Sequence, residues 1–277
     1  MSFKIIVDSC CDLTPAQLRE DCFVSVPLTI RVGEHIVVDD ASFDQGALLW
    51  RMKESATAPQ SSCPSPIQYL EAFDCGADDL YVVTLSALLS GSHNAAAQAR
   101  SLWLEDHPNS NVHIFNSCSA SAGEVLVALK IQELAQSGMD FTTVVSQVSR
   151  YINEMETYFV LETLDNLRKN GNSPGCSPWL PAPCTSSCSW APPPRVRSAK
   201  GPGHVHQAGP VQDGVPDGGG SQARGALTVH RPLQLPGAGL PRQGAGHEAV
   251  PFREILISDT GGISTVYAND GGIVVAY

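Results

Sequence analysis

The sequence is short of positive charge. Its 277 residues include 17 Lys and Arg against 28 Asp and Glu, which gives a formal net charge of -11 at pH 7. Nucleic acids and anionic membrane surfaces attract basic proteins, so neither is expected to be the main partner of this chain.

Long apolar runs are also absent. No stretch approaches the ~18 consecutive apolar residues that mark a transmembrane helix. The opening Met-Ser-Phe-Lys-Ile-Ile-Val-Asp has the pattern of a strand. It has neither the charged n-region nor the apolar h-region of a secretory signal peptide. We therefore expect a cytoplasmic protein with no membrane span.

The sequence has no Cys-x-x-Cys motif. Its nine cysteines are irregularly spaced, and an odd number leaves at least one without a partner. In a reducing cytoplasm they are expected to be free thiols, several of them in the core. No regular spacing of metal ligands accompanies them, and we expect neither a metal ion nor a cofactor.

What the sequence does contain is an alternation of apolar strand-like runs with helical segments. This pattern predicts an α/β fold in which a mainly parallel sheet is flanked by helices. The loops after residues 7, 84 and 115 should then lie at one edge of the sheet, where ligands bind in such folds. The predicted strands are 4–7, 23–32, 35–38, 80–84, 112–115, 157–161, 254–258 and 272–277, and the main predicted helices are 43–53, 67–73, 94–104, 124–136, 141–153 and 162–169.

One strand-to-helix junction has the composition of an anion site. The apolar run that begins at Leu80 ends at Ser90-Gly91-Ser92, and an alanine-rich helical segment follows. The first amides of a helix have no partner within the helix, and its dipole favours negative charge there. The simpler alternative is an ordinary loop in which a serine caps the helix.

The composition changes abruptly at residue 173. Residues 173–251 hold 14 of the 20 prolines and 13 of the 24 glycines, and they contain no Ile, Phe or Tyr. Such a segment buries too little apolar surface to offset the entropy lost on ordering, so we predict that it is disordered or non-native. We expect an N-terminal α/β domain over 1–155 and a second, incomplete α/β domain over 156–277.

The sharp edges of this segment also suggest a genetic explanation. A bias toward Pro, Gly, Arg, Cys and His is typical of a GC-rich gene that is read in the wrong frame. We hypothesise two compensating frameshifts, near codons 172 and 251.

Several blocks of the sequence resemble the DegV family of fatty-acid-binding proteins. The matching blocks occur in the family's order and extend over residues 3–171 and 254–277. They are Asp8–Leu13, Val26–Leu28, Ser61–Pro66, Leu89–Ser92, Phe115–Ser117 and, as the most specific match, Tyr158–Gly171.

The resemblance implies a function and a site. A long-chain fatty acid such as palmitate would lie buried, with its carboxylate held by hydroxyl groups from two loops at Ser61 and Ser90. A separate fatty-acid kinase would then phosphorylate the carboxylate, so this chain would be a carrier and not an enzyme. Tyr267 falls where many members have a histidine. Our candidate ligand-binding residues are Ser61, Ser62, Ser90, Gly91 and Tyr267.

Two other interpretations remain open. Ser90 could be the nucleophile of an acyl hydrolase with His93 as base, but the chain has no Gly-x-Ser-x-Gly elbow. Alternatively, the polypeptide could be a partly folded, non-functional product of a frameshifted gene.

Overall fold

The first sheet carries the N-terminal half of the fold. The computed structural model describes residues 2–160, 196–197, 227–232, 252–268 and 272–277. Four parallel strands run in the order β2-β1-β6-β7, which confirms the predicted α/β class. They are β1 (Phe3–Asp8), β2 (Phe23–Val26), β6 (Asp79–Thr84) and β7 (Asn111–Asn116).

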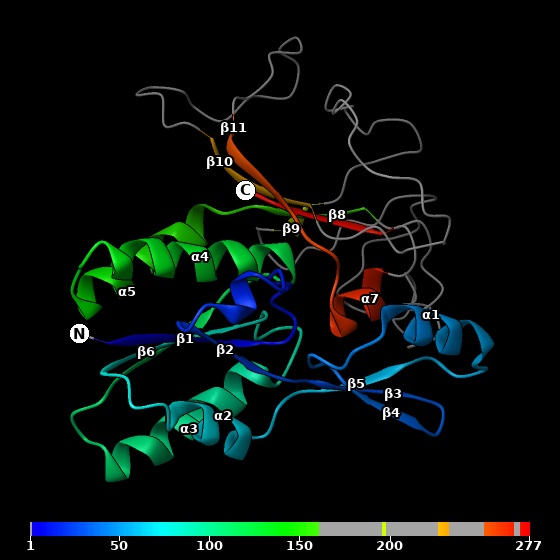
Figure 1. Cartoon of the computed structure of the whole chain (residues 1–277), viewed down its shortest axis with the longest axis horizontal. Helices are drawn as coiled ribbons and strands as arrows, with labels where there is room; N and C mark the ends of the chain where they lie inside the picture. Colours follow the sequence, from blue (N-terminus) through cyan, green and yellow to red (C-terminus); the bar gives the residue numbers. More distant parts are fainter. Residues whose placement is uncertain (1, 161–195, 198–226, 233–251, 269–271) are drawn as a thin grey trace.

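Helices cover both faces of this sheet (Figure 1). One face packs against α2 (Pro66–Phe73) and α3 (Ser92–Asp106), and the other against α4 (Ala122–Gln136) and α5 (Phe141–Glu154). All six residues of β6 are buried, as expected for a central parallel strand with a helical layer on each side.

A smaller sheet lies beside the first and carries one of the candidate residues. It consists of β3 (Thr29–Val32), β4 (His35–Val38) and β5 (Gln60–Ser62), paired antiparallel in the order β4-β3-β5. Its inner face packs on α1 (Gln45–Glu54) and on α7 (Gly262–Ala268) from the C-terminal part of the chain. Figure 1 shows α7, in red, next to α1.

The second sheet has the strand order β11-β10-β12-β8-β9. Its strands are β8 (Thr157–Val160), β9 (Val196–Arg197), β10 (Leu227–Pro232), β11 (Phe252–Ile257) and β12 (Ile273–Ala276). Helix α4 contacts strands of both large sheets. This position explains why buried residues occur on every side of α4.

The structure corrects part of the prediction for residues 173–251. Two short segments of it are strands, β9 and β10, because β8 and β12 provide paired edges for them. The remainder, like the predicted helix at 162–169, lies outside the described residues. The second sheet begins at Thr157, and the domain boundary that we expect at 155/156 stays a prediction.

Three local features also differ from what the sequence predicts. Thr14 followed by Pro15 is typical of a helix start, and Thr14 and Gln17 hydrogen-bond to each other as in one, but only a 3-10 turn, η1 (Gln17–Arg19), follows before the chain enters β2. The segment at 60–62, expected as a loop, pairs with β3 as the edge strand β5. Helix α7 was not predicted.

Candidate functional site

Ser61 and Tyr267 meet at the candidate site. Their hydroxyl oxygens are 3.1 Å apart, although the residues come from β5 and α7. The register explains this contact. Ser61 is paired with Ile30, whose fully buried side chain marks the inner face of the small sheet. Directly paired residues share a face, so Ser61 points toward α7.

Ser62 is not brought into this site. It is paired with Thr29, one position along from the Ile30–Ser61 pair. Because side chains alternate along a strand, Ser62 projects from the opposite face of the small sheet. Of the two adjacent serines, therefore, only Ser61 lies with Tyr267.

The loop that carries Ser90 lies next to the loop that follows Ser61. A Cβ atom built on Gly91 would be 3.0 Å from the Sγ atom of Cys63. Glycine therefore permits this close approach of the two loops. Ser90 is half-buried, and its Oγ atom accepts a hydrogen bond from the amide of Ser92 at 3.1 Å.

The simpler alternative, a serine cap at α3, is met in part, because the Ser90 hydroxyl accepts the amide of Ser92, the first residue of the helix. Gly91 is the N-cap residue and makes no side-chain capping hydrogen bond. The hydroxyl of Ser92 is fully buried and donates to the carboxylate of Asp8 at 2.6 Å. The serine just after the glycine thus has an internal partner, whereas Ser90 lies at the surface of the loop.

Two buried aspartates hold α7 in place. The carboxylate of Asp39 accepts the amides of Gly262 at 2.7 Å and Ile263 at 3.0 Å. Asp12 accepts the amide of Gly261 at 2.8 Å. Burial raises the pKa of both carboxyls, that of Asp12 to about 7. These contacts fix the helix on which Tyr267 stands.

Neither aspartate is among the site residues predicted from the sequence. Asp12 belongs to the opening DegV-like block, which is the one signal that could have found it. Asp39 and Asp40 are adjacent, and such a pair is usually part of a solvent-exposed turn. In the structure Asp40 is exposed as this pattern predicts, but Asp39 is buried. Among the residues that the structure describes, no group of three His, Cys, Asp or Glu could hold a metal ion.

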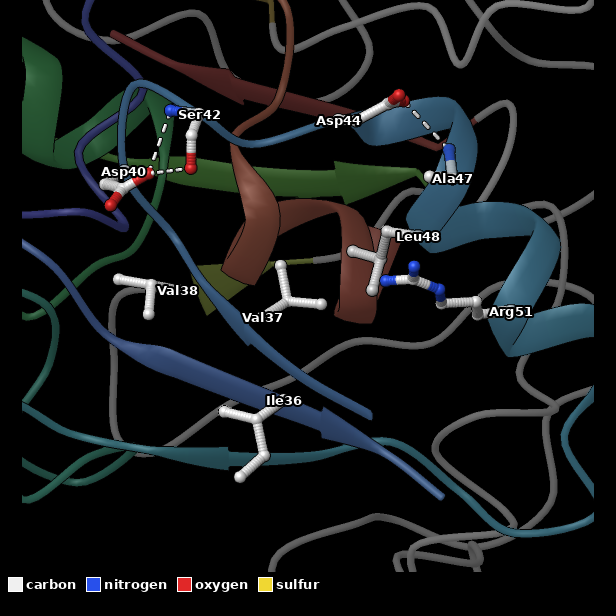
Figure 2. Close-up of a pocket in the computed structure, with 9 residues that line it drawn as sticks. All are labelled: Ile36, Val37, Val38, Asp40, Ser42, Asp44, Ala47, Leu48 and Arg51. Atoms are coloured by element: carbon white, nitrogen blue, oxygen red, sulfur yellow. Dashed lines mark hydrogen bonds between the residues drawn. The ribbon is translucent and has the colours of Figure 1, made fainter. Parts of the chain in front are cut away.

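A pocket of about 430 Å³ opens at the edge of the small sheet, between β4 and α1. Figure 2 shows Val37 of β4 facing Leu48 and Arg51 of α1. Val37 and Leu48 also belong to the apolar cluster beneath Ser61 and Tyr267, together with Ile30, Ile263 and Val266. The pocket therefore adjoins the same core that lies below the two hydroxyl groups.

The geometry gives no support to a serine hydrolase. His93 is half-buried, and burial lowers the pKa of its imidazole. Within the described part of the chain no hydrogen bond joins His93 to Ser90.

The described part of the chain contains no helix with the length and apolar character needed to cross a membrane.

Comparison with known proteins identifies relatives of this chain. Residues 2–200 match the family model described as "Uncharacterised protein, DegV family". A DegV domain-containing protein of Streptococcus pneumoniae is 43% identical over 173 residues, and one of Streptococcus gordonii is 41% identical over the same length. The aligned stretch is 62% of this chain and spans 61% of the length of those relatives.

Solved structures match over the whole chain. A DegV family protein of Ruminococcus gnavus, refined with vaccenic acid, is 36% identical with a TM-score of 0.76. The Streptococcus pneumoniae fatty acid kinase (Fak) B3 protein, loaded with linoleic acid, is 29% identical with a TM-score of 0.71. Each match covers 100% of this chain and 99% of the other.

These matches lend no support to the frameshift hypothesis, which stays a prediction for resequencing to decide. The family model spans most of the chain, and the Ruminococcus gnavus protein matches it from end to end. The chain belongs to the DegV family.

Proposed function

We propose that this protein binds a long-chain fatty acid, such as palmitate, without catalysing a reaction on it. The observation that carries the proposal is the convergence of Ser61 and Tyr267 beside the Ser90-Gly91 loop, directly above an apolar cluster. Two related proteins contain vaccenic acid and linoleic acid, and they support the choice of ligand.

The carboxylate is assigned to the hydroxyl groups of Ser61 and Ser90. Both serines border the contact between Cys63 and Gly91, where helix α3 begins. The dipole of this 15-residue helix favours negative charge at that end. Tyr267 is 40% exposed and contacts Ser61. Its phenol can donate to the carboxylate as a histidine would.

The acyl chain is assigned to the inner face of the small sheet. Ile30 is paired with Ser61 on one side and with Val37 on the other. With neighbouring strands roughly 4.8 Å apart, this row leads about 10 Å from Ser61 to the pocket at β4. Leu48, Ile263 and Val266 flank the row from α1 and α7. The pocket volume of about 430 Å³ is of the size that small-molecule sites have.

The acyl chain and the carboxylate contribute differently to the binding free energy. Burying about fourteen methylenes at ~0.8 kcal/mol each gives on the order of 11 kcal/mol of transfer free energy, before the costs of immobilisation. A hydrogen bond to a carboxylate contributes about 1.5–3 kcal/mol. The tail therefore supplies most of the affinity, and Ser61 and Ser90 set the direction and depth of the ligand.

A fatty-acid kinase is the proposed partner, because a related protein is a fatty acid kinase (Fak) B3 protein. The kinase would act on the carboxylate that this chain presents.

The cytoplasm is the proposed compartment. The six cysteines in the described residues are all free thiols, which favours a reducing environment.

Native mass spectrometry tests the proposal. The purified chain, incubated with palmitate, is expected to bind one molecule, and Ser61→Ala and Ser90→Ala are each expected to weaken binding about tenfold. Ser62→Ala is the matched control, because that serine projects from the opposite face of the sheet. A wild-type chain that stays free of lipid, or equal weakening by Ser62→Ala, would contradict the proposal.

A further inference from the structure

A chain of buried hydrogen bonds lies behind the candidate head-group site. The hydroxyl oxygens of Tyr69 and Ser92 are 2.6 Å apart, and the Ser92 hydroxyl donates to Asp8 at 2.6 Å. The three residues come from α2, α3 and the end of β1, and all have a relative exposure of 0%.

The direction of these bonds follows from the number of hydrogens. Ser92 has one hydroxyl hydrogen, and it goes to the Asp8 carboxylate. Tyr69 must then donate to Ser92, because no other hydrogen lies between the two oxygens. Asp8 also accepts the amides of Leu85 at 3.0 Å and Cys10 at 3.2 Å. These donors favour the charged carboxylate, although burial is the larger effect and raises the pKa of Asp8 overall.

Glu124 is a second buried carboxyl near Asp8. It is fully buried in the first turn of α4, and within the described residues neither of its carboxyl oxygens has a hydrogen-bond partner. Burial, and then the charge of Asp8, raises the pKa of Glu124 well above its usual value. Asp8 accepts three hydrogen bonds, so of the two carboxyls Asp8 is the stronger acid and Glu124 holds its proton more tightly.

The other titratable groups around Asp8 are consistent with this assignment. Burial raises the pKa of the thiols of Cys10 and Cys11, and that of the Tyr69 phenol, so all three remain neutral. Asp12 is hydrogen-bonded to Ser121 and to the amide of Gly261. The Asp8 carboxylate is thus the acceptor at the end of the chain.

This chain of bonds is joined to both loops of the site. Tyr69 stands on the helix that directly follows the Ser61–Pro66 block. The amide of Ser92 donates to Ser90, and a Cβ atom built on Gly91 would lie 3.0 Å from the Sγ atom of Cys63 in the other loop. Through these hydrogen bonds the buried Asp8 is connected to both segments that carry the candidate serines.

We propose that Tyr69, Ser92 and Asp8 are positioning residues that hold the Ser61 and Ser90 hydroxyls at the separation a carboxylate requires. The inference rests on the proposed binding of a fatty acid at those serines. Side chains locked by buried hydrogen bonds keep a site closer to its binding geometry than solvent-exposed loops could alone.

Tyr69→Phe is the sharpest test, because it removes one hydroxyl and keeps the buried ring. We expect the affinity for palmitate to fall about tenfold. We also expect the ¹³C resonance of palmitate labelled at its carboxyl carbon to move from its wild-type position. Ser92→Ala should have the same effects, and the double variant should be no weaker than the worse single one, since both changes break one chain.

Ser119→Ala is the matched control. It removes the hydroxyl of another buried pair, Ser119 and Thr157, whose oxygens are 2.7 Å apart. We expect it to lower the unfolding midpoint while the ¹³C resonance stays in place. If Tyr69→Phe binds palmitate with wild-type affinity and resonance, or if the control moves the resonance equally, the positioning role is wrong. A wild-type chain that binds no palmitate would instead overturn the proposed function.

Discussion

Tyr267 and Ser61 lie 206 positions apart in the chain and share a hydrogen bond at the candidate site. The phenol of Tyr267 therefore lies beside one of the two hydroxyl groups that we propose for carboxylate binding. Tyr267→Phe should remove this contact and one donor to the carboxylate. We expect a threefold to tenfold weaker affinity for palmitate, measured by displacement of a fluorescent fatty acid. Unchanged affinity would exclude Tyr267 from the head-group site.

Gly91 provides a second prediction for a single residue. A methyl group there would lie 3.0 Å from the Sγ atom of Cys63, so Gly91→Ala requires the Cys63 side chain or its loop to move. We expect weaker palmitate binding for Gly91→Ala and recovery in the double variant Gly91→Ala/Cys63→Ala, where the sulfur is absent. The double variant would show no recovery if the loops did not meet at this point.

For single residues, the sequence shows which side chains could bind a carboxylate but not how they are arranged. Ser90 and Gly91 are candidates because they follow a buried strand and precede a helix. Ser61 and Ser62 could not be told apart, because the face on which each lies depends on the pairing of β5 with β3. The role of Ser92 was hidden for a similar reason, since its partner Asp8 is 84 positions away.

Among the elements, α7 depends most on contacts from elsewhere in the fold. Asp39 accepts two of its amides, and Gln45 of α1 donates to Thr260 and Thr265. Asp39→Asn removes the negative charge and replaces one of the two acceptor oxygens of the carboxylate with an NH₂ group, which cannot accept a hydrogen bond. We expect a loss of about 1–3 kcal/mol in the free energy of unfolding, together with weaker palmitate binding because Tyr267 is displaced.

Asp40→Asn is the control for this prediction. Asp40 is exposed, and its carboxylate accepts hydrogen bonds from the amide and hydroxyl of the nearby Ser42. Its substitution should change the free energy of unfolding, measured in urea, by less than half as much. Equal effects at the two positions would mean that Asp39 has no special part in placing α7.

The elements that the sequence did and did not predict differ in the source of their stability. Strands β6 and β7 and helices α4 and α5 have apolar patterns that fix them locally, and all four were expected. Helix α7 has seven residues and is too short to be stable alone. Its first amides are satisfied by Asp39 and Asp12, which no local pattern shows. Strand β10 similarly depends on pairing with β11 and β12.

For the whole molecule, buried carboxyl groups should make stability depend on pH. Burial raises the pKa of Asp12 from 3.8 to about 7. Between these values the folded state holds a proton that the unfolded state has released, so stability falls as pH rises. The full effect for Asp12 alone is on the order of 4 kcal/mol.

Urea unfolding at pH 4.5 and at pH 7.5 checks this. We expect the wild-type chain to be less stable at the higher pH, and Asp12→Asn, which has no proton to lose, to show a smaller difference. Asp8, Asp39 and Glu124 also have raised pKa values and retain part of the effect in the variant. A wild-type chain that gains stability from pH 4.5 to pH 7.5 would contradict the account.

The most direct test of the central claim is a crystal structure of the chain with palmitate. The account predicts a carboxylate within hydrogen-bonding distance of the Ser61 and Ser90 hydroxyls, and an acyl chain that crosses the inner face of the small sheet past Ile30. A carboxylate bound elsewhere, for instance on Arg51 at the pocket beside β4, with Ser61 still bonded to Tyr267, would contradict it.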